Sequence, residues 1–550
     1  MSIPKLTLLL LPFLKGVIAQ TLPIVTLPWG KWQAQIYEND ANANPSYGPS
    51  CYQVNTSKLQ NPPGGTPGVQ NPNDGAPSSS EDCLFLDVYA PASAFDQNGN
   101  PIQELPVIVW FYGGAYAFGS KELGGGLPLY TGQSMLAASE YNAIFVAGNY
   151  RLGAFGWLAG SYMESNAQPN AGLYDQSLLL DWVQRYIIQA AGNPNQVSAW
   201  GESAGAGSIL HHLIRENGTR DPQFGSFLVQ SPAFEWSWDN SVNGTLDTIY
   251  RNFSALANCG FGYNISCLRG QSVNLLVSAN QKLFDAVHQT GLFPVGPAVD
   301  GKWVQTIPAI AFANHNYWPS IDGALISHVT NETASFTPQW VVSQSTFDAF
   351  LNDFFPEPSL GPVRAAMRAQ YNCKTTYSGN FRACIADLIR DSTFTCNTRQ
   401  LFEAYPSVAY MMRYAFPFDE YAVHASDLIP TFMNGFDDAY DMLRANNMSK
   451  TEAFLYAGFL DTEIMPWYQS YLASFGLHAN PNQGPSDTTY WPVATPGDEI
   501  GNVMQVHEIE FSLVTDDQNT ASICDFWTQI AKMIEGSGSV KKPPQDWKDL

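Results

Sequence analysis

One short stretch of the chain carries the clearest chemical pattern, a serine between two glycines. Gly201-Glu202-Ser203-Ala204-Gly205 follows a strand-like run that ends at Trp200, and small residues typical of a helix start come after it. A sharp turn from strand to helix lifts a serine hydroxyl clear of a sheet, and side chains at the flanking glycines would collide with neighbouring backbone. The helix start directs backbone N–H groups at negative charge that forms beside the serine. The pattern predicts a nucleophile, although by itself it also fits a glycine-rich helix start.

The residues on both sides of this stretch alternate between strand-like and helix-like patterns. Strands that are almost continuously apolar are buried on both faces, which is typical of a parallel sheet covered by helices. We therefore expect an α/β fold with a large mixed, mostly parallel central sheet, flanked by helices and covered by a helical cap from insertions. The expected strands are 83–89, 106–112, 144–147, 197–200, 227–230, 324–329 and 408–414. The main helix is expected at 175–190, and the cap at 260–319 and 347–399.

Composition limits the functions that are open to the chain. Its 550 residues are 45% hydrophobic, and no charge block or low-complexity linker divides them, so we expect one domain over residues 20–550. The net charge of −23 argues against nucleic acid or an anionic membrane as a partner. No Cys-x-x-Cys occurs, and Gly205-Ala206-Gly207 lacks the third glycine of a dinucleotide motif. We therefore expect no metal and no cofactor.

The N-terminus has the features of a secretory leader. Lys5 supplies a positive charge, residues 6–14 a short apolar core and residues 17–19 a small-residue cleavage site, so residues 1–19 are expected to be removed. No later stretch predicts a membrane-spanning helix, and we expect no integral membrane anchor. The protein is expected to be secreted and to carry N-glycans on some of its seven acceptor asparagines. These are Asn55, Asn217, Asn243, Asn252, Asn264, Asn331 and Asn447.

The eight cysteines fit an oxidising compartment, where most of them should pair. We expect the disulfides Cys51–Cys83 and Cys259–Cys267. The pairing of the other four stays open: Cys373, Cys384, Cys396 and Cys524. Proximity in the sequence alone favours Cys373 and Cys384 as partners.

Four motifs, in order along the chain, resemble one family. SEDCLFLDV (80–88), NYRLGAFG (149–156), NAGLYDQ (170–176) and GESAG (201–205) are similar to signatures of the type-B carboxylesterases and lipases, in particular secreted fungal members. The resemblance covers essentially the whole mature chain. It implies the α/β-hydrolase fold, a serine ester hydrolase and a catalytic triad in the order serine, acid, histidine. It also implies a buried ion pair between Arg151 and Asp175 and a second one that includes Glu81.

The triad order narrows the choice of histidine. Only His424, His478 and His507 follow any plausible acid. His424 comes after a strand-like run and continues into Asp427, as the family's histidine loop continues into an acidic residue. The Trp-Pro motif that follows this loop in the family lies before His507. We therefore expect His424 to be catalytic and the other two to be surface histidines.

The acid is expected directly after the strand at 324–329. The family places a glutamate there, usually followed by glycine, whereas this chain has Glu332 followed by Thr333. Asp322 is the alternative, although it precedes the strand. A glycan would be hard to place beside a buried acid, so we expect Asn331 to stay unmodified.

The resemblance gives each of these residues a role. His424 takes the proton of Ser203 so that the serine attacks the ester, and Glu332 fixes the imidazole tautomer and stabilises its cation. Glu202 is expected to support the histidine electrostatically. The oxyanion hole is expected from three backbone N–H groups, those of Gly114, Ala115 and Ala204.

The sequence is less specific about the ester. Cholinesterases of the family bind a quaternary ammonium on a tryptophan before the Glu-Asp-Cys motif, and no tryptophan lies between Cys51 and Cys83. In fungal lipases of the family the same loop is an amphipathic lid, but residues 61–80 are polar and rich in proline and glycine. We favour a carboxylesterase for soluble esters over a triacylglycerol lipase, so that the partner is a small-molecule or lipid ester.

A secreted binding or adhesion protein on the same fold is a third possibility. It predicts the loss of a triad residue, whereas all three candidates are present. Five aromatic residues could line an acyl pocket or belong to the core: Tyr116, Phe118, Phe234, Trp236 and Trp238.

Overall fold

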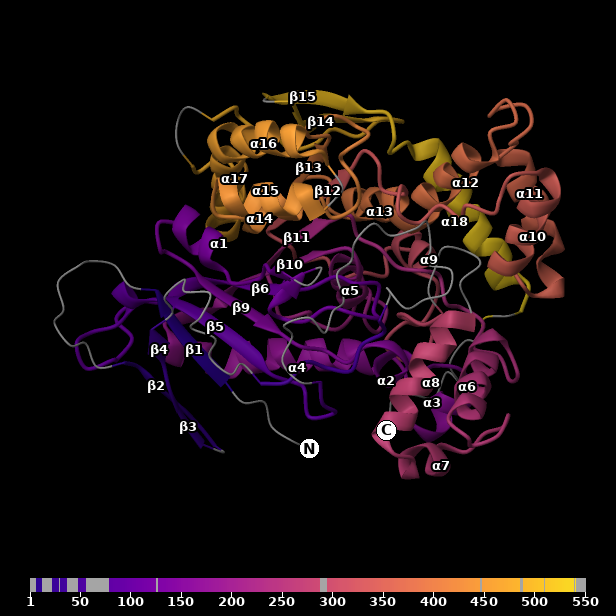
Figure 1. Cartoon of the computed structure of the whole chain (residues 1–550), viewed down its shortest axis with the longest axis horizontal. Helices are drawn as coiled ribbons and strands as arrows, with labels where there is room; N and C mark the ends of the chain where they lie inside the picture. Colours follow the sequence, from indigo (N-terminus) through magenta and orange to yellow (C-terminus); the bar gives the residue numbers. More distant parts are fainter. Residues whose placement is uncertain are drawn as a thin grey trace.

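The computed structural model describes residues 6–11, 22–28, 30–36, 48–55, 79–124, 127–286, 294–445, 448–484, 488–508, 510–538 and 540 (Figure 1). Within these ranges a large sheet crosses the molecule, and helices lie on both of its sides (Figure 1).

Eleven strands of the described residues form this sheet. They are β1 (Leu6–Leu11), β4 (Gln35–Ile36), β5 (Leu86–Pro91), β6 (Leu105–Phe111), β9 (Ile144–Gly148), β10 (Gly192–Glu202), β11 (Ser226–Gln230), β12 (Gly323–Val329), β13 (Ala409–Tyr414), β14 (Ile500–His507) and β15 (Glu510–Asp516). Their order across the sheet is β15-β14-β13-β12-β11-β10-β6-β9-β5-β1-β4. The pairs β5–β9 and β14–β15 are antiparallel, and the remaining neighbours are parallel. Two small antiparallel ribbons pair β2 (Ile24–Leu27) with β3 (Gly30–Gln33) and β7 (Leu123–Gly124) with β8 (Leu127–Pro128).

The central strands are buried along their length because helices cover both faces of the sheet. Every residue of β9, β11 and β12 is buried. In β10 the buried part begins at Val197, where its register against β6 becomes continuous, and it runs to the end of the strand. Such strands show continuous apolar runs rather than alternation, which is why the sequence reveals them. Parallel neighbours also bring the carboxyl ends of β6, β10, β11 and β12 to one edge of the sheet.

Some of the helices cover the faces of the sheet, and others form groups beside it. They are α1 (Gln133–Ala138), α2 (Gly153–Trp157), α3 (Ser161–Asn166), α4 (Ala171–Tyr186), α5 (Ala204–Leu213), α6 (Thr245–Leu256), α7 (Ile265–Gly270), α8 (Val273–Ala286), α9 (Pro308–Ala313), α10 (Gln344–Phe354), α11 (Gly361–Gln370), α12 (Phe381–Arg390), α13 (Cys396–Ala404), α14 (Leu428–Phe432), α15 (Phe436–Ala445), α16 (Lys450–Phe459), α17 (Met465–His478) and α18 (Ala521–Gly536). Figure 1 shows α3 and α6–α8 as one group and α10–α12 with α18 as another, both to the right of the sheet in this view. Helices α7, α8, α10, α11 and α12 lie in or overlap the insertions expected from the sequence, whereas α3, α6 and α18 lie outside them. No helix in the described ranges has both the length and the apolar character to cross a membrane.

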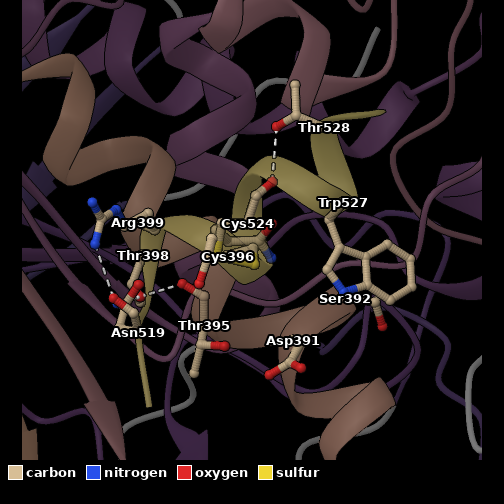
Figure 2. Close-up of a disulfide and its surroundings, with 12 residues drawn as sticks. Asp391, Ser392, Thr395, Cys396, Thr398, Arg399, Asn519, Cys524, Trp527 and Thr528 are labelled. Atoms are coloured by element: carbon tan, nitrogen blue, oxygen red, sulfur yellow. Dashed lines mark hydrogen bonds between the residues drawn. A yellow bond between two sulfur atoms is a disulfide. The ribbon is translucent and has the colours of Figure 1, made fainter. Parts of the chain in front are cut away.

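Four disulfides join described cysteines. Cys51–Cys83, Cys259–Cys267 and Cys373–Cys384 join residues that are 32, 8 and 11 positions apart. Cys396–Cys524 connects residues 128 positions apart and fastens the start of α13 to α18 (Figure 2).

Polar contacts extend this long-range connection. Asn519 donates its side-chain amide to the Thr398 hydroxyl, and Arg399 donates to the Asn519 carbonyl over 3.0 Å (Figure 2). The C-terminal helix is therefore held covalently and by hydrogen bonds against the helix that precedes β13.

The ion pairs differ in part from the expectation. Arg151 and Asp175 do pair, with 2.8 Å between Nε and Oδ2, but the arginine side chain is 40% exposed. The second expected pair is wrong, because Glu81 is exposed and makes no ion pair among the described residues. The buried pair in this region is instead Lys121 with Asp87, at 2.5 Å between Nζ and Oδ2. Asp87 belongs to the same motif as Glu81, so the motif was recognised but the wrong acid was chosen.

Candidate active site

The turn between β10 and α5 presents Ser203 at the edge of the sheet. Ser203 has φ 54° and ψ −124°, a conformation that side-chain-bearing residues rarely adopt, and α5 begins at the next residue. The two flanking glycines are sterically required. A Cβ on Gly205 would lie 1.9 Å from the Phe111 carbonyl oxygen, and a Cβ on Gly201 would lie 2.7 Å from the carbonyl carbon of Gly205. Backbone strain of this kind costs about 1–3 kcal/mol and persists where the surrounding structure enforces it.

A second turn, after β6, faces the serine. Gly114 has φ +112° and Ala115 has φ 52°, and a Cβ on Gly114 would lie 2.1 Å from the Phe118 carbonyl oxygen. A Cβ on Gly113 would come within 2.9 Å of the Ser203 Cβ, so only glycine allows this close approach. Among the described residues, no protein acceptor bonds the N–H groups of Gly114, Ala115 or Ala204. These three donors are therefore free for an oxygen atom beside the serine.

A continuous hydrogen-bonded line joins Ser203, His424 and Glu332. The distance from His424 Nε2 to Ser203 Oγ is 2.8 Å, and from His424 Nδ1 to Glu332 Oε2 it is 2.6 Å. The other carboxylate oxygen, Oε1, accepts from the Val329 N–H over 3.1 Å. Glu332 lies just after β12 and is buried, and His424 lies in the loop that follows β13. Three segments from distant parts of the chain thus meet in one line.

The alternative residues lie elsewhere. Asp322 is exposed just before β12, and among the described contacts only its backbone is hydrogen-bonded, to Gly225. His478 is exposed at the end of α17. His507 ends β14 and its ring lies 6.0 Å from that of Phe418. Neither histidine is hydrogen-bonded to the serine among the described contacts.

The charges of two further acids, Glu202 and Asp427, also act on the imidazole, and the sequence indicated only one of them. Glu202 Oε1 lies 3.2 Å from His424 Nε2, and Asp427 Oδ2 accepts from Gln230 Nε2 over 3.0 Å. Burial raises the pKa of Glu202 to about 8 and that of Asp427 to about 7. Burial also acts to lower the pKa of His424, but the charge of Glu202 and the hydrogen bond and charge of Glu332 outweigh it and raise that pKa to about 9. Of these two, only Glu202 was predicted to act on the histidine.

The contact with Glu202 leads to a testable pH dependence. A neutral imidazole is needed to accept a proton, so kcat/KM should rise with pH through the pKa of His424, which lies above its ordinary value. Glu202→Gln removes the negative charge that raises this pKa. We expect the acidic limb of the kcat/KM profile to move to lower pH by about one unit. Glu510→Gln, an exposed acid at the start of β15, serves as the control. An unmoved acidic limb in Glu202→Gln would show that Glu202 does not act on the imidazole.

A cavity opens in front of the serine, and Ser203 is part of its wall. Its wall is mainly apolar, with Tyr116, Phe234, Val295, Phe336 and Phe394, and Glu235 and Thr393 are its polar side chains apart from Ser203. Phe336 and Phe394 also pack on His424, with ring centroids 5.2 and 4.9 Å from the imidazole.

The expected acyl-pocket aromatics divide between this cavity and the core. Tyr116 and Phe234 line it, whereas Trp236 lines a smaller cavity behind it. Phe118 and Trp238 line neither. A π-helical turn at 391–395, which the sequence did not indicate, places Thr393 and Phe394 in the cavity wall. In the described part of the chain, no three His, Cys, Asp or Glu side chains cluster in a way that could hold a metal.

Comparison with known proteins decides the family. The model of the carboxylesterase family matches residues 30–527. The chain belongs to the carboxylesterase family. A secreted lipase of Arthroderma benhamiae is 33% identical over 538 residues, 96% of each chain. Carboxylesterase patB of Penicillium expansum is 35% identical over 378 residues, which cover 66% of this carboxylesterase and 64% of the relative. Lipase 2 of Geotrichum candidum is 28% identical over 493 residues, 83% of this chain and 79% of the lipase.

Solved structures show the same architecture for this chain. EstA of Aspergillus niger superimposes with a TM-score of 0.70 at 21% identity, over 94% of this chain and 99% of EstA. A thermophilic PNB esterase gives a TM-score of 0.66 at 22% identity, over 90% of each chain. The fold is that of an α/β-hydrolase, as the sequence predicted. The carboxylesterase is accordingly an enzyme, a hydrolase of carboxylic esters.

Proposed function

We propose that this carboxylesterase cleaves its ester through an acyl-enzyme intermediate, with Ser203 as nucleophile, His424 as general base and acid, and Glu332 as the acid of the triad. The line of hydrogen bonds from the Ser203 hydroxyl through His424 to Glu332 is the observation that carries this proposal. It lies at the edge of the cavity that an ester can enter, since Ser203 is itself part of the cavity wall.

The proposed reaction follows from these contacts. In the neutral imidazole, Nδ1–H donates to Glu332 and Nε2 accepts the proton of Ser203 as the serine oxygen attacks the carbonyl carbon. The imidazolium then gives the proton to the departing alcohol, which leaves an acyl group on the serine. A water molecule repeats the sequence and releases the acid. Glu332 stays ionised throughout and stabilises the imidazolium.

The tetrahedral oxyanion is proposed to bind in the turn that faces the serine. The unbonded N–H groups of Gly114, Ala115 and Ala204 are its donors. They are fixed before the substrate arrives, so they require no reorganisation when negative charge forms. Because the donors belong to the backbone, alanine at position 115 serves as well as glycine. With φ 52°, Ala115 already adopts the backbone conformation that the turn requires.

For the substrate we propose soluble esters with an acyl group of short or medium length. The mainly apolar wall of the cavity fits the alkyl part of such a group. The second candidate is a lipase activity, which the names of the Arthroderma and Geotrichum relatives favour. The polar loop 61–80, on which the argument against a lid rests, lies outside the described residues except for its last two positions.

Hydrolysis of 4-nitrophenyl esters from acetate to palmitate tests this substrate assignment. We expect the highest kcat/KM between acetate and octanoate, with no increase in rate when the ester concentration passes the solubility limit. Ser203→Ala serves as the background control, because any hydrolysis that it retains does not come from the proposed site. A rate that rises only with emulsified long-chain esters would instead identify the protein as a lipase.

We also propose that the chain is secreted, with residues 1–19 removed. The relationship to a secreted lipase and the four disulfides support this localisation. Strand β1 belongs to this leader, so its removal takes that strand from the sheet. Four acceptor asparagines are exposed and are the proposed glycan sites: Asn217, Asn243, Asn252 and Asn264. Asn55 is buried, the amide of Asn331 donates to the Glu420 carbonyl, and Asn447 lies outside the described residues.

A further inference from the structure

A carboxyl group that the proposed mechanism does not use lies in the wall of the cavity. Glu235 follows β11, in a segment held firmly against the nucleophile. The N–H of Ala233 donates to the Ser203 carbonyl over 3.0 Å, and the Tyr116 hydroxyl donates to the Ala233 carbonyl over 3.1 Å. Two residues later, Glu235 lines the same cavity as Ser203. Its position relative to the reacting atoms is therefore fixed by the segment and not by a mobile loop.

The Glu235 carboxyl has no protein partner among the described residues. It makes no hydrogen bond and no ion pair there, although the side chain is only partly exposed. Its chain neighbours Phe234 and Trp236 are buried. Glu235 also lines a second, smaller cavity, whose wall is apolar except for Glu235, Ser237 and His211. A carboxyl group that lies in a largely apolar wall without a protein partner is available to a polar group of a ligand in the cavity.

The protonation state of Glu235 limits what it can bind. Burial alone raises its pKa to about 8, and no neighbouring charge contributes. His211 does not supply a positive charge, because burial lowers its pKa to about 4, and its Nδ1 is occupied by the Gly207 carbonyl at 2.6 Å. At neutral pH the Glu235 carboxyl is therefore mostly uncharged, and it can both donate and accept a hydrogen bond.

Glu235 belongs to the acyl side of the cavity. His424 returns its proton to the departing alcohol, so the alcohol must lie on the side of the imidazole. His424 is not part of the wall of this cavity, which contains Ser203 together with Ala115 and Ala204, two of the proposed oxyanion donors. The acyl group, which stays on the serine, is therefore placed in this cavity, whose wall contains Glu235.

We propose that Glu235 is a specificity-determining residue that selects acyl groups carrying an uncharged hydrogen-bonding oxygen, such as a hydroxyl group on the acyl chain. This inference rests on the proposed acyl-enzyme function of Ser203. The apolar wall accommodates the alkyl part of such an acyl group, and Glu235 pairs with its oxygen. A plain alkyl chain would leave the carboxyl unpaired, and sites built to bind a hydroxyl discriminate strongly against analogues that lack it.

The test compares ethyl hexanoate with the ethyl esters of 3-, 5- and 6-hydroxyhexanoic acid, followed by acid release in a pH-stat at pH 7. We expect the wild-type kcat/KM for at least one hydroxy ester to exceed that for hexanoate by about tenfold or more. Glu235→Gln keeps the size and both hydrogen-bonding functions, so it should retain this preference. Glu235→Leu has an apolar side chain of similar size, so it should lose the preference and hydrolyse hexanoate at least as well as the wild type.

Several outcomes would overturn the inference. One is a wild-type enzyme that prefers hexanoate to every hydroxy ester, and another is a preference that survives in Glu235→Leu. A preference that disappears in Thr393→Val but not in Glu235→Leu would assign the selection to the other polar side chain of the wall. Faster hydrolysis of ethyl 6-aminohexanoate than of all hydroxy esters would mean that an ionised carboxylate binds an ammonium, which contradicts the uncharged state.

These outcomes are separable from failure of the proposed function. If the protein hydrolyses hexanoate through Ser203 but shows no hydroxyl preference, only the role of Glu235 is wrong. If no ester in the set is hydrolysed beyond the rate of Ser203→Ala, the proposed function itself fails and the inference fails with it.

Discussion

His424→Ala is expected to lower kcat for 4-nitrophenyl butyrate by about 10⁵–10⁶-fold, the largest effect that we predict for a histidine of this chain. The reason is that Nε2 lies 2.8 Å from Ser203 Oγ, so the imidazole is the group in position to accept the serine proton. Alanine leaves the hydroxyl with its ordinary, very weak acidity, and attack on the ester stops. Steady-state kinetics at saturating substrate measures the loss, and circular dichroism checks that the variant is folded.

His507→Ala is the matched control for this prediction. His507 stands in a sequence context that superficially imitates a catalytic histidine, but it lies at the end of β14 and contacts Phe418. Its replacement should leave kcat unchanged. A large loss of kcat in His507→Ala, together with a small one in His424→Ala, would reverse the assignment of the general base.

Glu332→Gln is expected to lower kcat by about 10⁴-fold. The carboxylate accepts the His424 Nδ1–H through Oε2 and the Val329 N–H through Oε1. With both oxygens engaged by donors, a glutamine must direct its NH₂ group toward one of these N–H donors or turn away. If the NH₂ faces Nδ1, the imidazole is driven into the tautomer with Nε2 protonated, which cannot take the proton of Ser203. The same kinetic assay measures the effect, and KM should change much less than kcat.

Asp322→Asn provides the control for the acid. From the sequence, Asp322 was the alternative to Glu332 for the triad acid. Asp322 is exposed and directly precedes β12. Its substitution should have no effect on kcat. A 10⁴-fold loss in Asp322→Asn with normal activity in Glu332→Gln would exclude Glu332 as the triad acid.

The sequence predicted the sheet well because the central strands are buried on both faces. Runs such as 106–112 and 324–329 are continuously apolar, and β6 and β12 occupy nearly the same residues. The antiparallel pair β14 and β15 was missed. Its second strand is largely exposed and mixes polar with apolar residues, so it lacks the pattern of the buried strands. A local pattern identifies a strand only where burial dictates its composition.

In the site, too, the sequence predicted best what depends on neighbouring residues, and it missed some contacts between distant segments. Ser203 belongs to a motif whose glycines are required by backbone contacts within one turn, so its geometry could be inferred directly. The contacts of His424 with Glu202 and with the rings of Phe336 and Phe394 join segments far apart in the sequence. Glu235 gave no sequence signal, because a single glutamate between aromatic residues has no motif. Only the fold shows that Glu235 lines the cavity of the nucleophile.

Covalent trapping of the nucleophile tests the central claim most directly. The enzyme is incubated with an ethyl fluorophosphonate, which phosphonylates an activated serine, and intact mass and peptide mapping locate the adduct. We predict one adduct per chain on Ser203, loss of ester hydrolysis in proportion to labelling, and no adduct in Ser203→Ala or His424→Ala. An adduct on a different residue, or full hydrolytic activity in an enzyme whose Ser203 is completely labelled, would contradict the account.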